Sequence, residues 1–295
     1  MREGKASWTA ELTAVHRAVE SMKPENERIC YDPIAKNFMS TSARLIGKSR
    51  FLMNIAMWYA SERPWPGEMG TVVARTRYID DYVDACIQNG IQQLVILGAG
   101  FDSRAYRISG LAGKVKVFEL DWPETQELKI GKIKRIFGVL PEHVVYVPID
   151  FNKEKLDQKL PQSGYDRGIK TLFIWEGVTM YLTAEGVDET LAFVYGNSGE
   201  GSSIVFDYLQ YSDEYDPDGL KMLRKCEETV RKRCEPWTFG LQRGAIEGFL
   251  TQRGFHQVVN ATAKDLKSSY FGGRNQKRKL FPFLPVVHAT VKPRA

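Results

Sequence analysis

A glycine turn and the charged residues near it are the part of this sequence whose residue types and spacing could do chemistry. The apolar residues 94–97 run directly into Gly98-Ala99-Gly100, and Asp102 follows shortly after. Glycine has no Cβ, so the backbone of such a turn can approach a ligand closely. Asp102 is suited to cap a helix that begins after the turn. An apolar strand, a glycine turn and a helix start are typical of sites for nucleotide-like ligands.

The turn differs from a dinucleotide site in two ways. A pyrophosphate-binding turn has the pattern G-x-G-x-x-G and places the phosphates at a helix N-terminus. Here Ser103 occupies the position of the third glycine, and Asp102 would repel a pyrophosphate. The turn therefore favours a ligand without phosphate. S-adenosylmethionine, which carries an adenosine, a sulfonium and an amine, is such a ligand.

Acidic residues end the next predicted strand. The spacing from Gly98 to Asp121 is close to the roughly 20 residues that separate such a turn from the acid that binds the ribose hydroxyls. Glu119 is a competing candidate, because side chains two residues apart on a strand point to the same side. The sequence leaves both residues as candidates for the ribose site.

The third and fourth predicted strands also end in acids. Asp150 and Phe151 follow the third strand, and Glu176 follows the fourth. A carboxylate beside an aromatic ring suits adenine, since the carboxylate accepts from the exocyclic amine and the ring packs on the base. Ligands of open α/β sheets bind at the carboxyl ends of the strands. We therefore expect these residues to line one site with the glycine turn.

The elements that would position these residues alternate along the chain. Strands are predicted at 93–97, 115–119, 143–149, 171–175, 203–208, 255–260 and 285–292. Helices are predicted at 8–22, 43–60, 71–89, 103–110, 123–138, 153–160, 184–195, 217–234 and 242–252. Short apolar strands that alternate with helices indicate an α/β fold of the Rossmann-like kind, with a mostly parallel seven-stranded sheet covered by helices on both faces.

The order of the elements suggests two parts within one compact unit. Residues 1–90 are predicted to form an N-terminal helical cap, and residues 91–295 the α/β domain with a helical insertion around 211–245. Small residues and Arg17 share one face of the first helix, so we expect something to pack closely there. The basic loop at 272–279 is interpreted as a solvated, mobile connection, with a lid or an anion-contacting loop as the alternative.

Composition narrows the class of protein. A hydrophobic content of 43% and a charged content of 26% are ordinary for a globular protein, and the net charge of +5 is mild. The cysteines form no C-x-x-C pair and the histidines have no zinc-ligand spacing, so we expect reduced thiols and no metal. No apolar run reaches the roughly 20 residues of a membrane span. With no signal peptide evident at the N-terminus, we expect a cytoplasmic protein that does not bind membranes.

Three motifs together resemble the leucine carboxyl methyltransferase family. They are VILGAGFDSR at 95–104, FELDWP at 118–123 and WEGVTMYL at 175–182. The resemblance extends upstream through 9–10, 17–19, 32–33 and 74–77, and Arg253-Gly254-Phe255 also fits. It implies the class I methyltransferase fold and S-adenosylmethionine as cofactor, with S-adenosylhomocysteine as product.

The resemblance also implies roles for individual residues. The methionine carboxylate of the cofactor would meet Arg17 and Arg75, and its amino group would lie near Glu176. Gly98 would line the cofactor, with Ala99 and Gly100 in the same turn. Asp121 would hold the ribose, and Asp150 and Phe151 the adenine. The sequence alone supports Arg75 independently, because it lies at the edge of an apolar helix stripe, where a buried arginine needs an anion. That anion would be the ligand or, as the alternative, a neighbouring acid of the chain itself.

The predicted reaction is methyl transfer, with an oxygen as the expected nucleophile. The acceptor would be a small molecule, or a protein C-terminal carboxylate. A carboxylate needs no general base, whereas a hydroxyl does. No residue stands out as a base, although His16 is one candidate, and we assign no catalytic residue. Tyr181 and Tyr211 are candidate substrate contacts, and the aromatic residues between 208 and 239 would form the acceptor pocket or a core of their own.

Three alternatives stay open. A protein that binds S-adenosylmethionine without transferring the methyl group is compatible with the same residues. An NAD-dependent oxidoreductase would need the third glycine, which is Ser103 here. RNA methylation is favoured only by the basic loop at 272–279, and no stripe of basic and aromatic residues accompanies it. Nucleic acid is therefore not an expected partner. The sequence does not indicate an oligomeric state.

Overall fold

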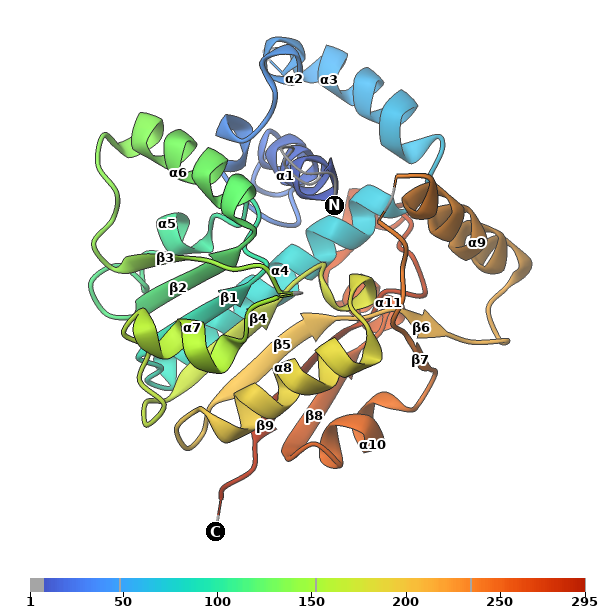
Figure 1. Ribbon diagram of the computed structural model, residues 1–295. Helices are drawn as coiled ribbons and strands as arrows, with labels where there is room; N and C mark the ends of the chain where they lie inside the picture. Colours follow the sequence, from blue (N-terminus) through green and yellow to red (C-terminus); the bar gives the residue numbers. More distant parts are fainter. Residues whose placement is uncertain (1–7, 48, 152, 234, 295) are drawn as a thin grey trace.

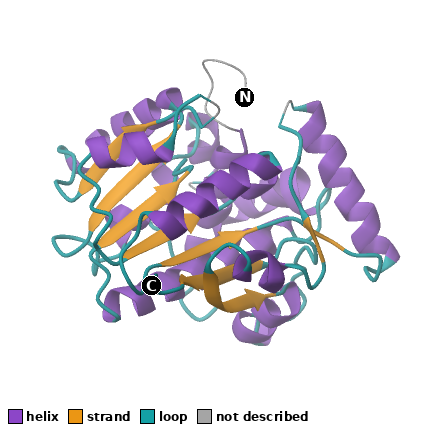
Figure 2. Cartoon of the chain, turned by 60° about the horizontal axis from the view of Figure 1, so that its bottom comes forward, coloured by secondary structure: helices purple, strands orange, loops and turns teal. Residues whose placement is uncertain are grey.

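The computed structural model describes residues 8–47, 49–151, 153–233 and 235–294, and a seven-stranded sheet lies at its centre (Figures 1 and 2). The strand order is β3-β2-β1-β4-β5-β9-β8. The strands are β1 Gln93–Leu97, β2 Lys116–Asp121, β3 Val144–Pro148, β4 Thr171–Trp175, β5 Ser203–Asp207, β8 Phe255–Ala261 and β9 Val286–Val291. Strands β1 to β5 are parallel, and β9 runs antiparallel to both β5 and β8. The order reverses between β1 and β4, which opens a crevice at the carboxyl ends of these strands.

Helices cover both faces of the sheet (Figure 2). Those within the α/β part are α5 Arg104–Arg107, α6 Pro123–Phe137, α7 Leu156–Gln162, α8 Ala184–Gly196, α9 Pro217–Lys232, α10 Ile246–Thr251 and α11 Ala263–Tyr270. Those before the sheet are α1 Trp8–Ser21, α2 Thr41–Ile46, α3 Arg50–Met57 and α4 Glu68–Gln88. A short two-stranded sheet joins β6 Gln210–Tyr211 to β7 Leu241–Gln242. The predicted sheet, mostly parallel and covered on both faces, is confirmed.

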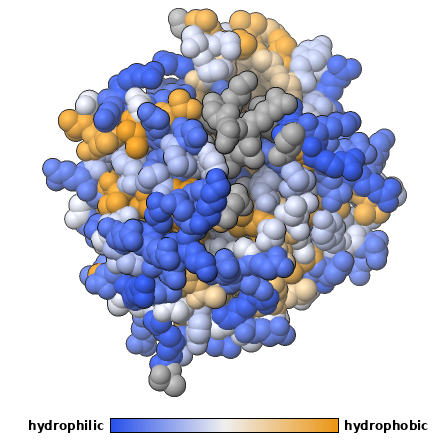
Figure 3. Space-filling view, viewed as in Figure 1, coloured by the Kyte–Doolittle hydropathy of each residue, from blue (hydrophilic) through white to orange (hydrophobic). Residues whose placement is uncertain are grey.

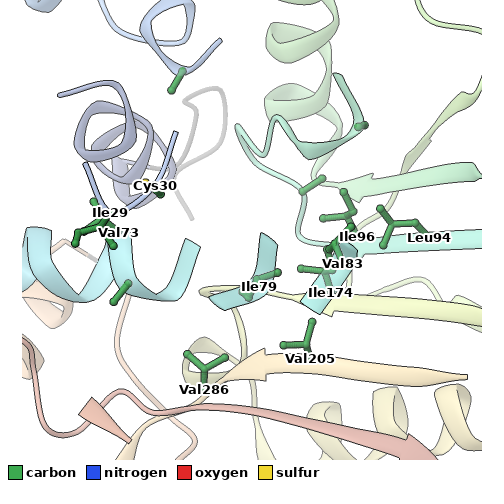
Figure 4. Packing of buried hydrophobic residues seen from close by; sticks show 14 of the residues in the cluster. Ile29, Cys30, Val73, Ile79, Val83, Leu94, Ile96, Ile174, Val205 and Val286 are labelled. Carbon is green, nitrogen blue, oxygen red and sulfur yellow. The ribbon is translucent and has the colours of Figure 1, made fainter. Parts of the chain in front are cut away.

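Alternation along the strands divides the core into two layers. On β1, Leu94 and Ile96 belong to one cluster of buried side chains, whereas Val95 and Leu97 belong to the cluster on the opposite face. Figure 4 shows the first cluster, in which Ile79 of α4 lies beside the sheet residues. The helix α4 therefore covers one face of the sheet, although its sequence lies within the predicted N-terminal cap.

The segment predicted as one helix at 43–60 is divided in the structure. Ser49 begins α3, and its hydroxyl accepts from the backbone N–H of Leu52 at 3.3 Å, a serine cap that explains the new start. A π-helical turn, Trp58–Glu62, follows α3 directly. The buried side chains of α3 are Met53 and Met57. Apolar side chains consequently lie on the surface of this region, at the top of Figure 3: Leu45, Ile46, Phe51, Leu52, Ile55, Trp58 and Tyr59.

The basic loop after α11 contacts the end of α1 and the segment that follows it. Arg278 donates to both carboxylate oxygens of Glu20, at 2.8 and 3.0 Å. Arg274 donates to Glu27 at 2.5 Å, and Asn275 donates to the carbonyl of Glu27 at 2.9 Å. The loop thus binds carboxylates of the chain itself. The helix α11, which the sequence did not predict, positions it.

No helix in these described ranges has both the length and the apolar composition that a bilayer span requires. The cysteines Cys30, Cys86 and Cys226 are free and buried, while Cys234 lies outside the described residues. The expectation of reduced thiols is therefore consistent with the three that are described.

The packing of α4 on the sheet predicts that shortening a side chain of α4 destabilises the protein more than shortening an exposed side chain of α3. Ile79 is fully buried, whereas Ile55 on α3 is 41% exposed. We expect Ile79→Ala to lower the free energy of unfolding by about 2–5 kcal/mol, because it leaves a cavity against the sheet. The matched control Ile55→Ala should change it by about 0.5 kcal/mol or less. Urea unfolding followed by circular dichroism measures both, and equal losses would contradict this view of the core.

Candidate functional site

A cavity of about 480 Å³ lies at the carboxyl ends of the central strands. Its walls come from the glycine turn after β1, the ends of β2 and β4, the helix α1, the beginning of α4 and the helix α9. The helices α1 and α9 lie above the sheet in Figure 1. A volume of this size suits a small-molecule ligand. The sheet topology therefore places the cavity at the crevice where ligands of such folds bind.

The glycine turn forms one end of the cavity. Gly98 and Gly100 have φ values of 68° and 39°, in the left-handed region that favours glycine. A Cβ on Gly98 would lie 2.5 Å from a methyl group of Val178, and one on Gly100 would lie 3.3 Å from Ala10 of α1. The Asp121 carboxylate accepts from the backbone N–H of Gly100, and from that of Trp122 at 2.6 Å. The end of β2 thus holds the turn in place.

Glu176, at the end of β4, bridges two buried arginines. One of its carboxylate oxygens accepts from Nε of Arg75 at 2.8 Å, and the other accepts from Arg104 at 2.7 Å. Arg75 also donates to Asp207 at 2.5 Å, and Arg104 donates to Asp102 at the same distance. These contacts join α4, β4, β5 and the residues after the glycine turn through charged hydrogen bonds.

Arg17 connects α1 to the same region. Its Nε donates to Asp32 at 2.9 Å, and its Nη2 donates to the carbonyl of Phe101, next to the glycine turn, at 2.6 Å. Ser103 donates to Asp32 at 2.6 Å as well. The small-residue face of α1 is packed as expected, since Ala14 and Ala18 are buried. The helix therefore closes over the turn and is held there by an ion pair.

The pKa values of the acids reflect this pairing. Burial alone would raise the pKa of Glu176, but Arg104 and Arg75 outweigh it and hold that pKa well below its ordinary value. Burial raises the pKa of Asp121, although two backbone N–H groups oppose the change. Burial also raises the pKa of Asp207, which Arg75 counteracts. Of the three, Glu176 is the carboxylate held most firmly in its ionised form.

The charge lining the cavity is predominantly negative. Of the described lining residues, the cations are Arg17 and Arg75, and both are already paired with carboxylates. The acids that line it are Glu68, Asp102, Asp121, Glu176 and Glu235. No described lysine lines the cavity. Such a lining fits a ligand that carries positive charge, and does not fit a pyrophosphate.

Most of the residues predicted from the sequence meet at this cavity. Its lining includes Arg17, Arg75, Gly98, Ala99, Gly100, Asp121, Phe151, Glu176 and Tyr181. Glu119 is absent from the lining: it is fully buried, with Lys129 at 2.8 Å and the Tyr106 hydroxyl at 2.9 Å. Alternation correctly put Glu119 and Asp121 on one side of β2, but only Asp121 lies at the strand end.

Two other predicted residues also lie outside the lining. Asp150 is adjacent to Phe151 at the end of β3 and forms an ion pair with Lys153 at 3.3 Å. Tyr211 packs against the same apolar cluster as Met180 and Phe281, which line the cavity, but it does not line the cavity itself, and its hydroxyl donates to Glu227 at 3.2 Å. Among the aromatic residues expected between 208 and 239, Trp237 lines the cavity. The others pack within the core or against α9, which was the alternative interpretation.

Several lining residues were missed by the sequence analysis. They come from α1, the segment before α4, the first turn of α4 and the residues after β4: Thr9, Leu12, Thr13, Trp65, Glu68, Thr71, Val178, Met180 and Leu182. Trp65 lies in the segment Arg63-Pro-Trp-Pro-Gly67, which predicts a chain break but no direction for the ring. Thr9 lies within the resemblance at 9–10, and Thr13 lies on the face of α1 that carries Arg17; these were the available signals for the two residues.

Comparison with known proteins identifies the family. Residues 10–195 match the leucine carboxyl methyltransferase family. The chain belongs to this family. YktD of Bacillus subtilis (strain 168), whose name gives it provisionally as an S-adenosyl-L-methionine-dependent methyltransferase, is 29% identical over 99% of this chain and 100% of its own length. A protein of Mycobacterium avium (strain 104) with the same provisional description is 30% identical over 89% of this chain and 86% of its own.

Solved structures share the fold at low sequence identity. One from Thermobifida fusca has a TM-score of 0.58 and 14% identity, and covers 96% of this chain and 95% of its own. A DUF574 family protein from Streptomyces avermitilis has a TM-score of 0.57 and 12% identity, with 99% of each chain covered. The fold predicted by the resemblance is confirmed. As a member of this family, the chain is an S-adenosylmethionine-dependent methyltransferase, and S-adenosylmethionine is its cofactor.

The paired state of Glu176 predicts a pH-dependent stability difference. Its pKa is depressed in the folded protein, so its contribution is present above the pKa of the unfolded chain and is lost as the pH falls. We expect Glu176→Gln to be less stable than the wild type at neutral pH. The gap should stay nearly constant from about pH 7 to about pH 5 and narrow between about pH 5 and about pH 3, because the carboxyl then gains a proton in the unfolded chain while Glu176 of the folded wild type stays ionised. Urea unfolding across that range measures the gap.

The exposed Glu185 on α8 provides the matched control. Glu185→Gln should show almost no gap at any pH. A gap for Glu176→Gln that stays constant over the range would show that the charge of Glu176 does not determine its contribution.

Proposed function

We propose that this methyltransferase transfers the methyl group to an oxygen atom of a small organic acceptor. The observation that carries the proposal is that the cavity has two chemically different kinds of lining. The glycine turn and the acids Asp102, Asp121 and Glu176 lie at or just after the strand ends, whereas apolar and aromatic side chains come from the segment before α4, the residues after β4 and the segment 236–284. We expect the first set to hold the cationic cofactor and the second set, which we call the apolar end, to hold an acceptor with an apolar ring.

The adenosine would lie along the glycine turn and the ends of β2 and β3. The backbone of Gly98, Ala99 and Gly100 is accessible to a ligand, because the two glycines have no side chain and Ala99 has only a methyl group. The Asp121 carboxylate would accept from the ribose hydroxyls with lone pairs that Gly100 and Trp122 leave available. Phe151 would pack on the adenine.

Two further acids near the adenosine have smaller roles in the proposal. Asp150, beside Phe151, would accept from the adenine amine only after its side chain reorients, because it does not line the cavity. Glu119 would act indirectly, through its ion pair with Lys129, by supporting β2 beneath the ribose.

The methionine part would lie against the two lining arginines. Each guanidinium has five N–H donors. The hydrogen bonds of Arg75 to Glu176 and Asp207 use its Nε and Nη1, and those of Arg17 to Asp32 and Phe101 use its Nε and Nη2. The remaining nitrogen of each could donate to the methionine carboxylate. The ammonium group would lie near Glu176, whose charge Arg75 and Arg104 only partly neutralise.

The acceptor would occupy the apolar end. Its walls include Trp65, Met180, Tyr181, Trp237 and Phe281. Met180 and Phe281 are buried, so a ring placed against them is shielded from water. Bound S-adenosylmethionine supplies an activated methyl group. The side chains of this end would hold the acceptor oxygen in line with it, and such alignment can contribute up to about 7–11 kcal/mol.

A substitution at Asp121 tests the cofactor placement. Asp121→Asn removes the charge but nearly keeps the size, and it weakens the interaction with the ribose hydroxyls. We expect the Kd for S-adenosylmethionine to rise about 10- to 100-fold, as for the loss of a hydrogen bond to a charged group. Isothermal titration calorimetry measures this. The exposed Asp213 gives the control Asp213→Asn, which should bind like the wild type, and equal affinity in both variants would refute the placement.

Radiolabelled cofactor tests the reaction itself. The protein is incubated with S-adenosylmethionine tritiated on the methyl group and with a cell extract, whose small-molecule and protein fractions are then separated. We expect label in small molecules, attached to oxygen. Label confined to protein would indicate a protein carboxylate as acceptor instead. Absence of transfer, with cofactor binding intact, would indicate a binding protein without this activity.

A further inference from the structure

His16, Ser61 and Glu68 form a hydrogen-bonded chain at the side of the cavity. They come from α1, the π-helical turn Trp58–Glu62 and the first residue of α4. Nε2 of His16 lies 3.0 Å from the Ser61 hydroxyl, which donates to Glu68 at 2.6 Å. His16 and Glu68 both line the cavity. Turns of the π-helical kind are frequent at functional sites.

The serine determines where the protons lie. Its hydroxyl carries a single hydrogen, and ionised Glu68 accepts that hydrogen. The Ser61 oxygen must then accept from His16, so the ring proton is on Nε2. The other ring nitrogen, Nδ1, carries a lone pair. It is buried and has no hydrogen-bond partner in the described part of the chain.

The surroundings keep this ring neutral. Burial, followed by the nearby charges of Arg17 and Arg75, lowers the pKa of His16 to about 3. The imidazole is fully buried, and its unpaired nitrogen is the group that a donor in the cavity could satisfy. A hydroxyl of the acceptor has such a donor, whereas an ionised carboxylate has none.

We propose that His16 takes the proton of a hydroxyl-bearing acceptor and that Ser61 and Glu68 carry this proton away. The inference rests on the proposed transfer to oxygen and narrows the acceptor to a phenol or alcohol. As the acceptor oxygen bonds to the methyl carbon, the sulfur–methyl bond breaks and its electron pair stays on sulfur. The hydroxyl proton moves to Nδ1, the Nε2 proton moves to Ser61, and the serine proton moves to Glu68. The products are the methyl ether, S-adenosylhomocysteine and a protonated Glu68.

The relay avoids a charged imidazole. A histidine with a strongly lowered pKa is a weak base by itself, but here the ring gives up one proton as it receives another. Glu68 is suited to end the chain, because burial, and then Glu62, raise its pKa to about 7 against the opposing effects of Ser61 and Arg233. The thiol of Cys226 also faces Glu68, and burial keeps it protonated by raising its pKa to about 12.

The tautomer of His16 tests the relay without any acceptor. Nitrogen-15 NMR of the whole protein, with His16→Gln to assign the signals, distinguishes the two ring nitrogens. As the pH falls through about 7, Glu68 gains its proton, and we expect the ring to change from the Nε2–H to the Nδ1–H form while it stays neutral. Glu68→Gln should abolish this change. A ring that becomes charged near its ordinary pKa, or a tautomer independent of Glu68, overturns the proposal.

Activity provides the second test, with tritiated S-adenosylmethionine and the small-molecule fraction of the extract. Alkali releases methanol from methyl esters but leaves methyl ethers intact, so we expect alkali-stable label. Glu68→Gln and Ser61→Ala should reduce the rate about 10²- to 10⁴-fold while the Kd for S-adenosylmethionine is unchanged. Ser61→Thr, which restores a hydroxyl, should recover most of the rate, and the exposed-site variant Glu185→Gln should behave as the wild type.

The possible failures are distinct. Absence of any labelled product contradicts the proposed transfer. Alkali-labile label supports transfer to oxygen but overturns the hydroxyl acceptor. Alkali-stable label with an unchanged rate in Glu68→Gln overturns the relay. A purely structural role would change stability in all of these variants, yet it would not make the rate of the wild type rise with pH through about 7 and lose that rise in Glu68→Gln.

Discussion

The pairing of Glu176 with Arg75 and Arg104 is the interaction on which the site depends. Each of these three side chains is almost wholly removed from water. A buried charge is tolerated only when it is paired and hydrogen-bonded, and removing one partner leaves the other uncompensated. The helix α4, the strand β4 and the residues after the glycine turn can therefore occupy only one relative arrangement. The cavity has its shape because this arrangement leaves space between them.

The network extends beyond that bridge and has a definite charge. Its members are four arginines and five carboxylates, Arg17, Arg75, Arg104, Arg107, Asp32, Asp80, Asp102, Glu176 and Asp207. One negative charge is thus left over next to the glycine turn. Dinucleotide-binding folds need the opposite balance at this place, since they receive phosphates. Two observations therefore disfavour a phosphate-bearing ligand: the turn departs from the G-x-G-x-x-G pattern, and the network is negatively charged.

The sequence predicted the features whose signals lie close together along the chain. It predicted less well the features that depend on contacts between distant segments. The bounds of β1 and β4 were predicted without error, because buried parallel strands are short apolar runs bounded by turns. Asp121 and Glu176 were found because strand ends of a parallel sheet share one edge. Arg75 was named from the family resemblance, and its place as a cation at the edge of an apolar helix stripe supported it. Each of these signals is local in sequence.

Residues whose environment depends on tertiary packing were predicted less well. The alternation of side chains places Glu119 and Asp121 on the same side of β2. Only Asp121 lines the cavity, because it lies at the end of the strand and Glu119 does not. Tyr211 has the residue type expected in a pocket, but its ring packs against the cluster of Met180 and Phe281 without lining the cavity, and its hydroxyl donates to Glu227. The hydrogen-bonded chain of His16, Ser61 and Glu68 joins three segments, and the spacing of these residues in the sequence follows no helix or strand periodicity. Its formation requires α1 to lie on α4, which no local pattern specifies.

The excess negative charge has a consequence for turnover when S-adenosylmethionine is placed as proposed. The cofactor carries an ammonium, a sulfonium and a carboxylate, and so has one net positive charge, whereas S-adenosylhomocysteine has none. Methyl transfer thus removes the charge that the network complements, and the attraction between a charged ligand and a buried, low-dielectric lining decreases with it. The protein would hold the reactive form of the cofactor more tightly than its product. The same buried ion pairs that fix the geometry of the cavity would then also favour release of the product.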